Sequence, residues 1–333
     1  MDHRKKTFII VLGVVVFLIL ALVIAIVLGK PGKTGSDLAP ITFNLTYIPN
    51  IQFAPVYVAL DQGYFADEGL DVSLYYGNEA DLVALIGSGH EKFMIASGEQ
   101  VLLSRAQGVP VVYVAAWYEE YPVAVAALAE KGIRQPVDLK GKDIGIPGLY
   151  GASYIGFEAL RSVAQLAETD LTLNSIGYTQ VEALASKQVD AAVIYVANEP
   201  IVLASQGYTV DLIKVSDYLE LVGNGLVTSE NTIKTEPHLV RGMVNALLKG
   251  ITFTQNSPEQ AYEISKDYVE NLASLDRDTQ LAILKASIDL WQVDRPGYSS
   301  ETGWSNMHQL LLDIGLLSRS IDFSQAYSND FIQ

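Results

Sequence analysis

Hydrophobic and polar residues follow three different patterns along this chain. Residues 8–28 are an unbroken apolar run, residues 41–215 alternate short apolar runs with helical patterns, and the residues after Glu236 repeat apolar positions at helical spacing. A long apolar run is typical of a membrane span, the alternation indicates an α/β sheet, and sustained helical spacing indicates helices alone. The pattern therefore predicts an anchor, an α/β region and a helical tail.

The apolar run Phe8–Leu28 follows the basic residues Arg4–Lys6. A helix of this length, rising ~1.5 Å per residue, crosses a hydrocarbon core about 30 Å thick, and the basic flank marks the cytoplasmic side. The competing interpretation is a cleaved secretory signal, whose apolar part usually has ~7 to 15 residues and ends at a small-residue site. Residues 29–33 (GKPGK) offer no such site. We therefore expect residues 1–40 to form a cytoplasmic stub, an uncleaved single-pass anchor at 8–28 and a linker, with the remaining chain outside the cytoplasm in either case.

Strand and helix patterns alternate in the α/β region. Strands are expected over Ile41–Tyr47, Asp71–Tyr75, Phe93–Ala96, Val111–Ala116, Val123–Ala126, Ile144–Ile146, Leu171–Asn174, Ala191–Tyr195 and Leu212–Val215. Helices are expected over Ala54–Gln62, Ala80–Ile86, Glu99–Gln107, Ala152–Ala167, Gln180–Ser186 and Ile201–Gln206, and in the tail over Glu236–Gln255, Pro258–Tyr268, Arg277–Leu290 and Ser305–Leu316. This order favours an α/β fold with parallel strands and crossover helices.

The alternation restarts after Trp117, which indicates two lobes. We expect the chain to cross between them near residues 117–122 and 218–225. Residues 41–118 and 220–333 then form the first lobe with the helical tail, and residues 119–219 form the second. Two such lobes close like a hinged clamp, and open parallel sheets bind ligands beyond the carboxyl ends of their strands. The loops after the strands are therefore the candidate binding segments.

Charge and composition narrow the function classes. The formal net charge of −16 argues against nucleic acid or an anionic lipid surface as partner, because both need clustered Lys and Arg. Cysteine is absent, so the chain forms no disulfide and carries no lipid-modified cysteine, which leaves the N-terminal helix as the membrane tether. Eighteen tyrosines, most of them in predicted loops, suggest a surface that stacks on a flat ring, although tyrosine also fills half-buried positions.

The loop after the first strand supplies flat rings, amides and a helix N-terminus. Its candidate ligand-binding residues are Tyr47, Asn50, Phe53 and Tyr57, and Pro55 is tolerated in the first helical turn because its missing N–H would be unpaired there. A plain turn would not need so many aromatic residues. We therefore expect one wall of the site here.

Two further strands lead into glycine-containing helix starts. After Phe93–Ala96, Gly98 lets the chain approach a ligand closely and Glu99 begins a helix, although Ser97 is equally a plain N-cap. After the strand that ends at Ile146, the segment GIPGLYGASY ends in the candidates Tyr150 and Tyr154. That segment lacks both the lysine of a phosphate loop and the G-x-G-x-x-G dinucleotide pattern, so we expect ring contacts there.

The remaining candidates lie at a strand end and at the two crossings. Tyr195, Asn198 and Glu199 follow the strand that ends at Tyr195. Glu199 either accepts N–H groups of a heterocycle or is a solvated carboxylate near a helix N-terminus. Trp117 at the first crossing and Asn224 at the second are either ligand contacts or hinge residues.

Signals of catalysis are weak. The four histidines lie in separate segments without metal-ligand spacing: His3, His90, His238 and His308. The sequence also lacks a G-x-S-x-G elbow and a cysteine nucleophile. We therefore expect a protein without catalytic residues, metal or cofactor.

The segment Tyr64–Val72 (YFADEGLDV), preceded by glycine, resembles the GYF-x-x-EGL-x-V stretch of periplasmic binding proteins for nitrate, sulfonates and the thiamine pyrimidine precursor. Shorter similar segments follow in the same order, at Ile86–Gly89, Ala106–Val112, Asp138–Lys142 and Val189–Ala192. On these segments the chain is identified as a member of this SsuA/ThiY-like superfamily. The resemblance implies the two-lobed type II periplasmic-binding-protein fold. It also implies the role of solute receptor for an ABC importer, with a permease and, through it, an ATPase as partners.

Within the superfamily, the aromatic loops resemble those of pyrimidine-precursor receptors, and the membrane-anchored, cysteine-free form resembles that of riboflavin-binding relatives. We favour riboflavin, because its flat isoalloxazine needs aromatic faces together with amides and N–H groups. The smaller thiamine pyrimidine precursor, formylaminopyrimidine, remains the alternative. Nitrate or sulfonate fits less well, since the proposed site loops contain no Arg or Lys.

Two other classes are weighed against a receptor. The resemblance includes fungal pyrimidine synthases, which use a lysine-bound pyridoxal phosphate, a sacrificial histidine and a cysteine cluster, and this chain has no cysteine. A sensory ectodomain would need a cytoplasmic partner domain, and only Met1–Thr7 lie on that side of the predicted anchor. A vitamin receptor that makes and breaks no bond is therefore the favoured interpretation.

Overall fold

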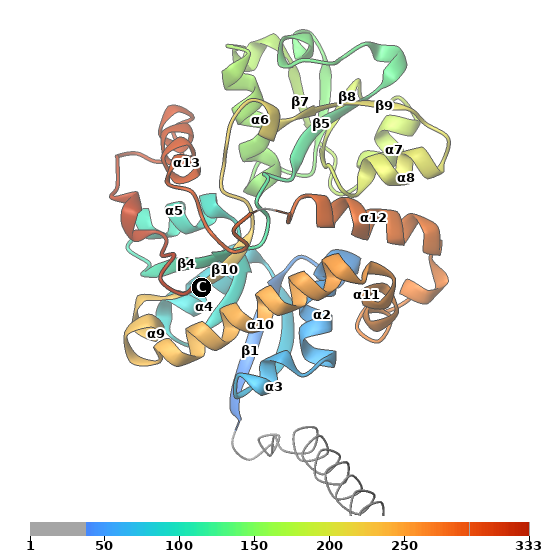
Figure 1. Ribbon diagram of the computed structural model, residues 1–333. Helices are drawn as coiled ribbons and strands as arrows, with labels where there is room; N and C mark the ends of the chain where they lie inside the picture. The colour runs from blue at the N-terminus through green and yellow to red at the C-terminus, as the bar shows by residue number, and fades with distance from the viewer. Residues whose placement is uncertain (1–37, 293, 333) are drawn as a thin grey trace, which may run out of the picture. The chain divides into compact units, whose positions relative to one another are not determined.

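The computed structural model describes residues 38–292 and 294–332. The predicted anchor at residues 8–28 lies outside them. None of the described helices is both long enough and apolar enough to cross a bilayer. From Ala39 onward the chain forms one compact unit built on two five-stranded sheets (Figure 1). The parts built on these two sheets are called the first and second lobe below, and the residue boundaries predicted for the lobes stay a prediction.

The first sheet has the strand order β2-β1-β3-β10-β4. Its strands are β1 (Ala39–Thr46), β2 (Leu70–Gly77), β3 (Phe93–Ala96), β4 (Val111–Ala116) and β10 (Gly225–Ser229). β1 is parallel to β2 and β3, with Phe43 opposite both Leu74 and Phe93. β10 lies between β3 and β4 and is antiparallel to both. The chain therefore returns to the middle of this sheet after building the second one.

The second sheet has the order β7-β6-β8-β5-β9. Its strands are β5 (Val123–Leu128), β6 (Asp143–Ile146), β7 (Thr172–Ser175), β8 (Ala191–Tyr195) and β9 (Val210–Lys214). β6 is parallel to β7 and β8, whereas β5 is antiparallel to β8 and β9. All six residues of β5 are buried, as an apolar strand between two neighbours and under helices requires.

Helices cover both sheets and form the C-terminal tail. The α-helices are α2 (Ala54–Asp61), α3 (Tyr64–Asp67), α4 (Glu79–Ser88), α5 (Gly98–Ala106), α6 (Gly151–Val163), α7 (Gln180–Ala185), α8 (Glu199–Ser205), α9 (Glu230–Thr235), α10 (Pro237–Asn256), α11 (Pro258–Ser265), α12 (Arg277–Asp289) and α13 (Glu301–Asp313). The 3-10 helices are η1 (Ile51–Phe53), η2 (Ala129–Lys131), η3 (Pro136–Leu139), η4 (Glu168–Asp170), η5 (Val215–Asp217), η6 (Leu272–Ser274) and η7 (Phe323–Gln325). Side-chain caps stabilise several starts; at α12, for example, Asp276 Oδ1 accepts from the Thr279 N–H at 2.8 Å.

Sequence patterns located β1 to β9 and the tail helices within a few residues, but they missed β10, α3 and α9. The expectation of parallel strands is wrong for β5 and β10. The pattern places Gly225 in the second crossing, whereas the structure begins β10 there. A Cβ added at Gly225 would lie 2.1 Å from Cζ of Tyr113, so only glycine lets this ring cover the start of the strand. The direction of a strand depends on where its crossing returns, which hydrophobic periodicity does not record.

The tail helix α10 closes the core of the first lobe against α2. Leu247 and Ile251 on its inner face are fully or almost fully buried. At the point of contact, a Cβ added at Gly250 would lie 2.1 Å from the carbonyl oxygen of Pro55. Glycine at this position therefore sets how closely the two helices approach.

Backbone hydrogen bonds tie the two crossings to the end of α12. The N–H groups of Trp117 and Tyr118 both donate to the Asn224 carbonyl, at 3.1 and 2.9 Å, and the Glu119 N–H donates to the Leu290 carbonyl at 3.0 Å. α12 contacts η1 of the first lobe and α8 of the second, and it runs between the two lobes in Figure 1. The tail thus reaches the junction of the lobes.

Candidate functional site

Buried polar atoms without a hydrogen-bond partner gather where the crossings meet. Among the described residues these are both carboxylate oxygens of Glu99, the indole nitrogens of Trp117 and Trp291, and the amide oxygen of Asn224. A buried polar group without a partner costs about 1–3 kcal/mol, and native proteins pair nearly all of them. These atoms are therefore the strongest candidates for contacts with a ligand.

Strand order brings three of these residues to one edge of the first sheet. Glu99 follows β3 in the first turn of α5, Trp117 follows β4, and Asn224 precedes β10. Because β10 runs antiparallel between β3 and β4, with Gly225 opposite both Ala96 and Ala116, its beginning lies beside the ends of its neighbours. The fourth residue, Trp291, comes from the end of α12, and its ring centroid lies 5.8 Å from that of Trp117.

Aromatic rings line this region. The Trp117 ring lies 5.9 Å from Phe53 and 6.1 Å from Tyr118, and the Tyr118 ring is perpendicular to that of Trp291 at 5.9 Å. Phe53 in turn makes an edge contact with Tyr76 at 5.9 Å. Side chains of this kind offer π faces to a flat ligand and N–H or O–H groups to its edge.

Two buried carboxyl groups of the candidate site, Glu79 and Glu99, influence each other electrostatically. Burial, with the negative charge of Glu79 as the second cause, raises the pKa of Glu99 to about 8. Glu79 Oε1 accepts hydrogen bonds from the N–H and the hydroxyl of Ser97 at 2.6 and 2.8 Å. Burial followed by the charge of Glu99 raises the pKa of Tyr121 and of Tyr195, so these two phenols lie near the same carboxylate. The site therefore combines acidic groups with aromatic surfaces.

Exposed tyrosines form a rim across the two lobes. The ring of Tyr47, at the end of β1, lies 5.1 Å from that of Tyr178, which follows β7 in the second lobe. Burial and then the neighbouring Tyr150 and Tyr47 raise the pKa of Tyr178, which groups all three phenols. Tyr47, Tyr150 and Tyr178 are 49%, 66% and 63% exposed. The rim is thus an accessible aromatic surface.

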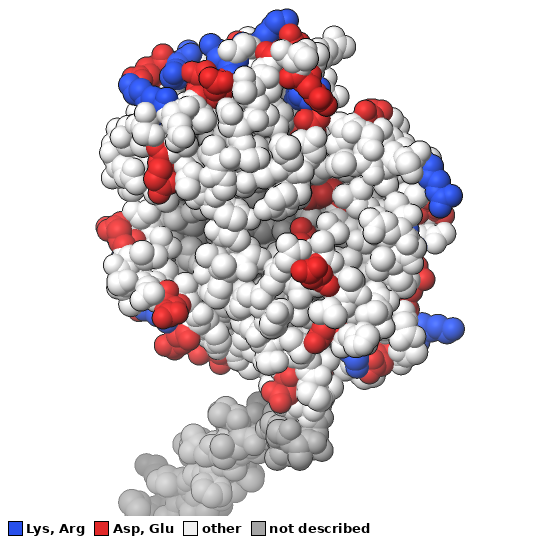
Figure 2. Space-filling view, turned by 180° about the vertical axis from the view of Figure 1, so that it is seen from behind, with Lys and Arg blue, Asp and Glu red and all other residues white. Residues whose placement is uncertain are grey.

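Figure 2 shows a face that is hollowed between the two lobes. Uncharged and acidic side chains border the hollow, whereas Lys and Arg gather at the far end of the upper, second lobe. Such a border offers little attraction to an anion.

Two predicted residues of the first loop serve the fold in this structure. Asn50 caps η1, since its Oδ1 accepts from the Gln52 N–H at 2.9 Å and its Nδ2 donates to the Ile48 carbonyl at 2.9 Å. Tyr57 is completely buried, stacks on Tyr268 at 4.9 Å and exchanges a hydroxyl hydrogen bond of 2.9 Å with Tyr76. Tyr57 therefore supports the wall behind Phe53 instead of presenting its own face.

The structure shows why position 98 is a glycine, which the sequence pattern does not reveal. A Cβ added there would lie 2.5 Å from Cβ of Val222 and 3.0 Å from its carbonyl oxygen. The glycine therefore admits the second crossing, and with it Asn224, to the start of α5. The sequence predicted that a ligand approaches the backbone at Gly98, whereas in the structure Val222 of the same chain lies there.

The predicted residues of the second lobe lie at the end of β8, at the start of α8 and on or just before α6. Glu199 Oε2 accepts from the Tyr195 N–H at 3.0 Å, and burial raises the pKa of Glu199. Asn198 is the N-cap of α8 and its side chain makes no cap hydrogen bond. Tyr154 is half-buried against the hydrophobic core, and burial followed by the charge of Glu158 raises its pKa.

Sequence reasoning did not name Trp291, Glu79 and Tyr178, which the structure brings to the candidate site. Trp291 stands at the end of a tail helix, Glu79 at an ordinary helix start, and Tyr178 in a short loop before α7. Of these three residues, only Tyr178 could have been chosen from the sequence, because it is a loop tyrosine that follows a predicted strand, like the other tyrosine candidates. The positions of the other two depend on contacts between distant segments.

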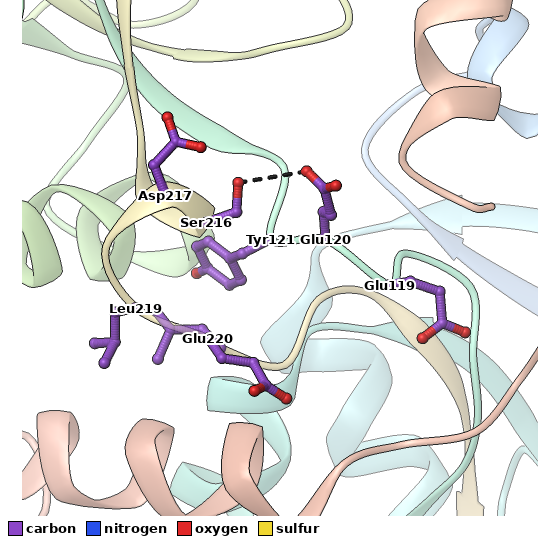
Figure 3. A pocket seen from close by; sticks show the side chains of 8 residues that line it. Glu119, Glu120, Tyr121, Ser216, Asp217, Leu219 and Glu220 are labelled. Carbon is purple, nitrogen blue, oxygen red and sulfur yellow. Dashed lines mark hydrogen bonds between the residues drawn. The ribbon is translucent and has the colours of Figure 1, made fainter. Parts of the chain in front are cut away.

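An acidic pocket of ≈ 320 Å³ lies beside the crossings (Figure 3). Its lining consists of Glu119, Glu120, Tyr121, Ser216, Asp217, Leu219, Glu220 and Leu221. Burial raises the pKa of Glu119 to about 7, and Ser216 donates to Glu120 at 3.4 Å. Its four carboxylates make this pocket unsuited to an anion.

Metal ligation receives no support from the described part of the chain. Within residues 38–292 and 294–332, no three His, Asp or Glu side chains are arranged to hold a metal ion. His308, on α13, instead accepts from the Ile321 N–H at 3.1 Å.

Comparison with known proteins gives a family match and relatives over most of the chain. A family model described as NMT1/THI5 like matches residues 50–261. The riboflavin-binding protein RibY of Chloroflexus aurantiacus is 35% identical over 303 residues, covering 89% of this chain and 86% of the relative. The formylaminopyrimidine-binding protein of Halalkalibacterium halodurans is 28% identical over 263 residues, covering 74% and 78%. The 4-amino-5-hydroxymethyl-2-methylpyrimidine phosphate synthase of Legionella pneumophila is 22% identical over 301 residues, covering 88% and 92%.

A solved structure shows the same fold at low identity. The periplasmic aliphatic sulphonate binding protein SsuA of Escherichia coli matches with a TM-score of 0.70 at 13% identity, covering 86% of this chain and 91% of that one. The two sheets therefore form the two-lobed α/β fold of type II periplasmic binding proteins, as the sequence resemblance implied.

Proposed function

The chain belongs to the NMT1/THI5-like family, and from this premise we propose that it is the extracytoplasmic solute-binding subunit of an ABC importer for a flat heteroaromatic vitamin, riboflavin. The protein binds its ligand without covalent chemistry between the lobes and delivers it to a permease that a separate ATPase drives. Closure of the lobes around the ligand supplies the signal for delivery.

The observation that carries this proposal is the group of unpartnered buried atoms among aromatic rings. Trp117 and Trp291 offer two N–H donors, whereas Asn224 and Glu99 offer oxygens. An isoalloxazine presents carbonyl oxygens and ring nitrogens to donors, an imide N–H to acceptors, and a large flat face to the rings of Phe53 and its neighbours. The two indole N–H groups thereby find acceptors on the ring, and its one imide N–H finds an acceptor among the oxygens of Glu99 and Asn224.

The relatives support the same class of ligand and leave one alternative. The relative at 35% identity is named for riboflavin and the one at 28% for formylaminopyrimidine. A pyrimidine carries the same kinds of polar group on a smaller ring, so it would satisfy the polar atoms but cover less aromatic surface. The second candidate is therefore a receptor for the thiamine pyrimidine precursor.

Anionic ligands fit this site poorly. The described site residues include two neighbouring carboxylates, Glu79 and Glu99, and no Lys or Arg. A sulfonate or nitrate ion needs cationic or multiple N–H donors to replace its water. The likeness to the sulphonate binding protein therefore concerns the fold and not the ligand.

Synthases in the same family raise the question of an enzyme. The pyrimidine phosphate synthase relative is 22% identical. This chain has no cysteine, whereas the fungal synthases that its sequence resembles use a cysteine cluster. A binding role is the better proposal, because the site residues satisfy a ligand's polar groups without supplying a nucleophile.

The proposed location is the outer side of a cell membrane, with the N-terminus in the cytoplasm. The apolar run Phe8–Leu28 and the basic residues before it support this proposal. Replacing residues 1–33 by a cleavable export signal should release the protein from membranes. Continued sedimentation with membranes would contradict the anchor.

A titration of the full-length protein in detergent tests the ligand. Riboflavin should quench tryptophan fluorescence, because Trp117 and Trp291 belong to the proposed site. It should also raise the melting temperature, since a hundredfold excess over Kd adds about 2.7 kcal/mol to the free energy of unfolding. Parallel titrations with formylaminopyrimidine and with an alkanesulfonate separate the alternatives. Saturable binding of the pyrimidine alone would replace riboflavin by the second candidate, and binding of neither would overturn the proposal.

A further inference from the structure

Glu99 is a carboxyl group whose burial, together with the charge of Glu79, disfavours its charged form more than nearby donors favour it. Glu99 is 1% exposed, and neither oxygen of its carboxyl group has a hydrogen-bond partner among the described residues. The hydrogen-bond donors nearest in sequence, the N–H and hydroxyl of Ser97, are used by Glu79 instead. A buried carboxylate without donors or a cation favours its neutral form.

Elements packed against α5 bring no free cation to Glu99. α5 contacts α4, β4, α6 and α13. The titratable or charged groups on these elements and on α5 itself are Glu79 and Asp81 on α4, Tyr113 on β4, Tyr154, Glu158 and Arg161 on α6, Glu301, His308 and Asp313 on α13, and Arg105 on α5. Arg161 is bonded to Glu158, Arg105 pairs with Glu230, and His308 accepts from Ile321. Tyr121 and Tyr195 add two phenols near the carboxylate.

Glu79 differs from Glu99 in having two donors of its own. Hydrogen bonds from Ser97 to a carboxylate oxygen favour the ionised form of that carboxylate. Two neighbouring buried carboxylates do not both ionise readily, because each charge raises the cost of the other. Burial raises the pKa of both carboxyls, but the two Ser97 donors oppose this at Glu79, so Glu79 is the better position of the two for a charge and Glu99 the better one for a proton.

We propose that Glu79 and Glu99 hold a single proton between them, so that Glu99 meets the ligand as a neutral carboxylic acid. This inference rests on the proposed function and specifies the ligand class. A carboxylic acid donates one hydrogen bond and accepts one, which complements a carbonyl beside an N–H, the imide edge of a pyrimidinedione-type ring. Glu79 does not touch the ligand in this scheme; it is a positioning residue that keeps the proton on its neighbour.

The scheme makes the receptor selective by charge. A neutral imide satisfies both groups of the acid, whereas a ligand with an anionic edge accepts one hydrogen bond and faces the charge of Glu79 behind it. When Glu99 loses its proton, the same site loses its donor and gains a second negative charge. Affinity for a neutral imide should therefore be constant below the pKa of Glu99, about 8, and fall about tenfold per pH unit above it.

The first test needs no ligand. Infrared spectra of the full-length protein in detergent should show the carbonyl band of a protonated buried carboxyl group at neutral pH, lost as the pH rises through about 8. Glu99→Gln should remove the component of this band that is lost near pH 8, whereas a component from Glu119, whose pKa burial raises to about 7, should persist. Glu79→Gln should move the loss of the Glu99 component to lower pH because the neighbouring charge is gone. Glu182→Gln, on an exposed part of α7, is the control and should change nothing. A wild-type spectrum without a Glu99 carboxyl band at neutral pH would overturn the shared proton.

The second test measures riboflavin affinity from about pH 6 to pH 9.5. The riboflavin affinity of the wild type should fall above the pKa of Glu99, and that of Glu79→Gln should begin to fall at lower pH. Glu99→Gln keeps one donor and one acceptor, so its affinity should not change with pH. This variant therefore controls for ionisation of the flavin itself. Flat wild-type affinity would overturn the inference while leaving the proposed function intact. Failure of riboflavin to bind at any pH would count against the proposed function. The infrared spectra would still decide whether Glu79 and Glu99 share one proton.

Discussion

The rings of Tyr47 and Tyr178 meet 5.1 Å apart at an angle of 53°, one from the end of β1 and the other from the loop after β7. β1 belongs to the first sheet and β7 to the second, so this contact joins the two lobes at the exposed rim. Tyr47 holds φ at +74°, in the left-handed region that residues other than glycine rarely adopt. The surrounding structure thus places this ring against its partner at some conformational cost.

Tyr178→Ala should speed the release of riboflavin. An aromatic pair contributes about 0.5–1.5 kcal/mol, so loss of the contact should raise the dissociation rate about two- to tenfold if the rim holds the lobes together around the ligand. Stopped-flow fluorescence measures this rate. Tyr75→Ala is the matched control, since Tyr75 is 54% exposed on β2. Equal rates for both variants would show that the Tyr47 contact does not retain the ligand.

Trp291→Phe should weaken riboflavin binding about tenfold. The substitution keeps an aromatic ring beside Trp117 and removes the N–H that has no partner within the described residues, together with part of the buried indole. A lost hydrogen bond to a ligand costs about 1–1.5 kcal/mol. Trp304→Phe is the comparison, because its N–H donates to Ser299 Oγ at 2.7 Å inside the fold. That variant should lose stability and keep its affinity. Calorimetric titration of both decides whether the Trp291 indole N–H contacts the ligand.

Gly250→Ala should destabilise the first lobe by about 1–3 kcal/mol. Its new methyl group would lie 2.1 Å from the Pro55 carbonyl oxygen, a backbone atom that cannot rotate away. Gly303→Ala provides the control in α13, where the nearest atom would be 3.4 Å away, in ordinary contact. Denaturant unfolding should separate the two variants. A Gly250→Ala protein as stable as the control would show that α10 and α2 can move apart without cost.

His308 should make the protein less stable as the pH falls below about 6.5. Burial lowers the pKa of His308, whose Nε2 accepts the Ile321 N–H at 3.1 Å. The unfolded chain therefore binds a proton more readily than the folded one, so this contribution to stability is present above the unfolded pKa and is lost as the pH falls through the folded pKa. The melting temperature of His308→Gln should fall less between pH 7 and pH 5 than that of the wild type. His90→Gln, an exposed histidine, should behave like the wild type.

Most individual elements were predictable because hydrophobic periodicity is a local property. β3, β4 and β8 have the predicted bounds, and the tail helices begin and end within a few residues of their predicted positions. Glu99, Trp117 and Asn224 entered the candidate site because they follow strands or lie at crossings. Trp291 did not, since nothing in the pattern around a tail helix shows which distant ring its last turn will meet. The role of Gly98 was also inaccessible, because it depends on Val222.

The sequence by itself determined the alternation of strands and helices, the family, and the acidic, cysteine-free character of the chain. Tertiary structure alone decided that β10 enters the first sheet antiparallel between β3 and β4. That insertion places Asn224 beside the ends of its neighbours and so beside Glu99 and Trp117. The reason is physical: burial of each segment leaves a periodic trace in its own residues, whereas the order and direction of strands arise from pairing between segments more than a hundred residues apart.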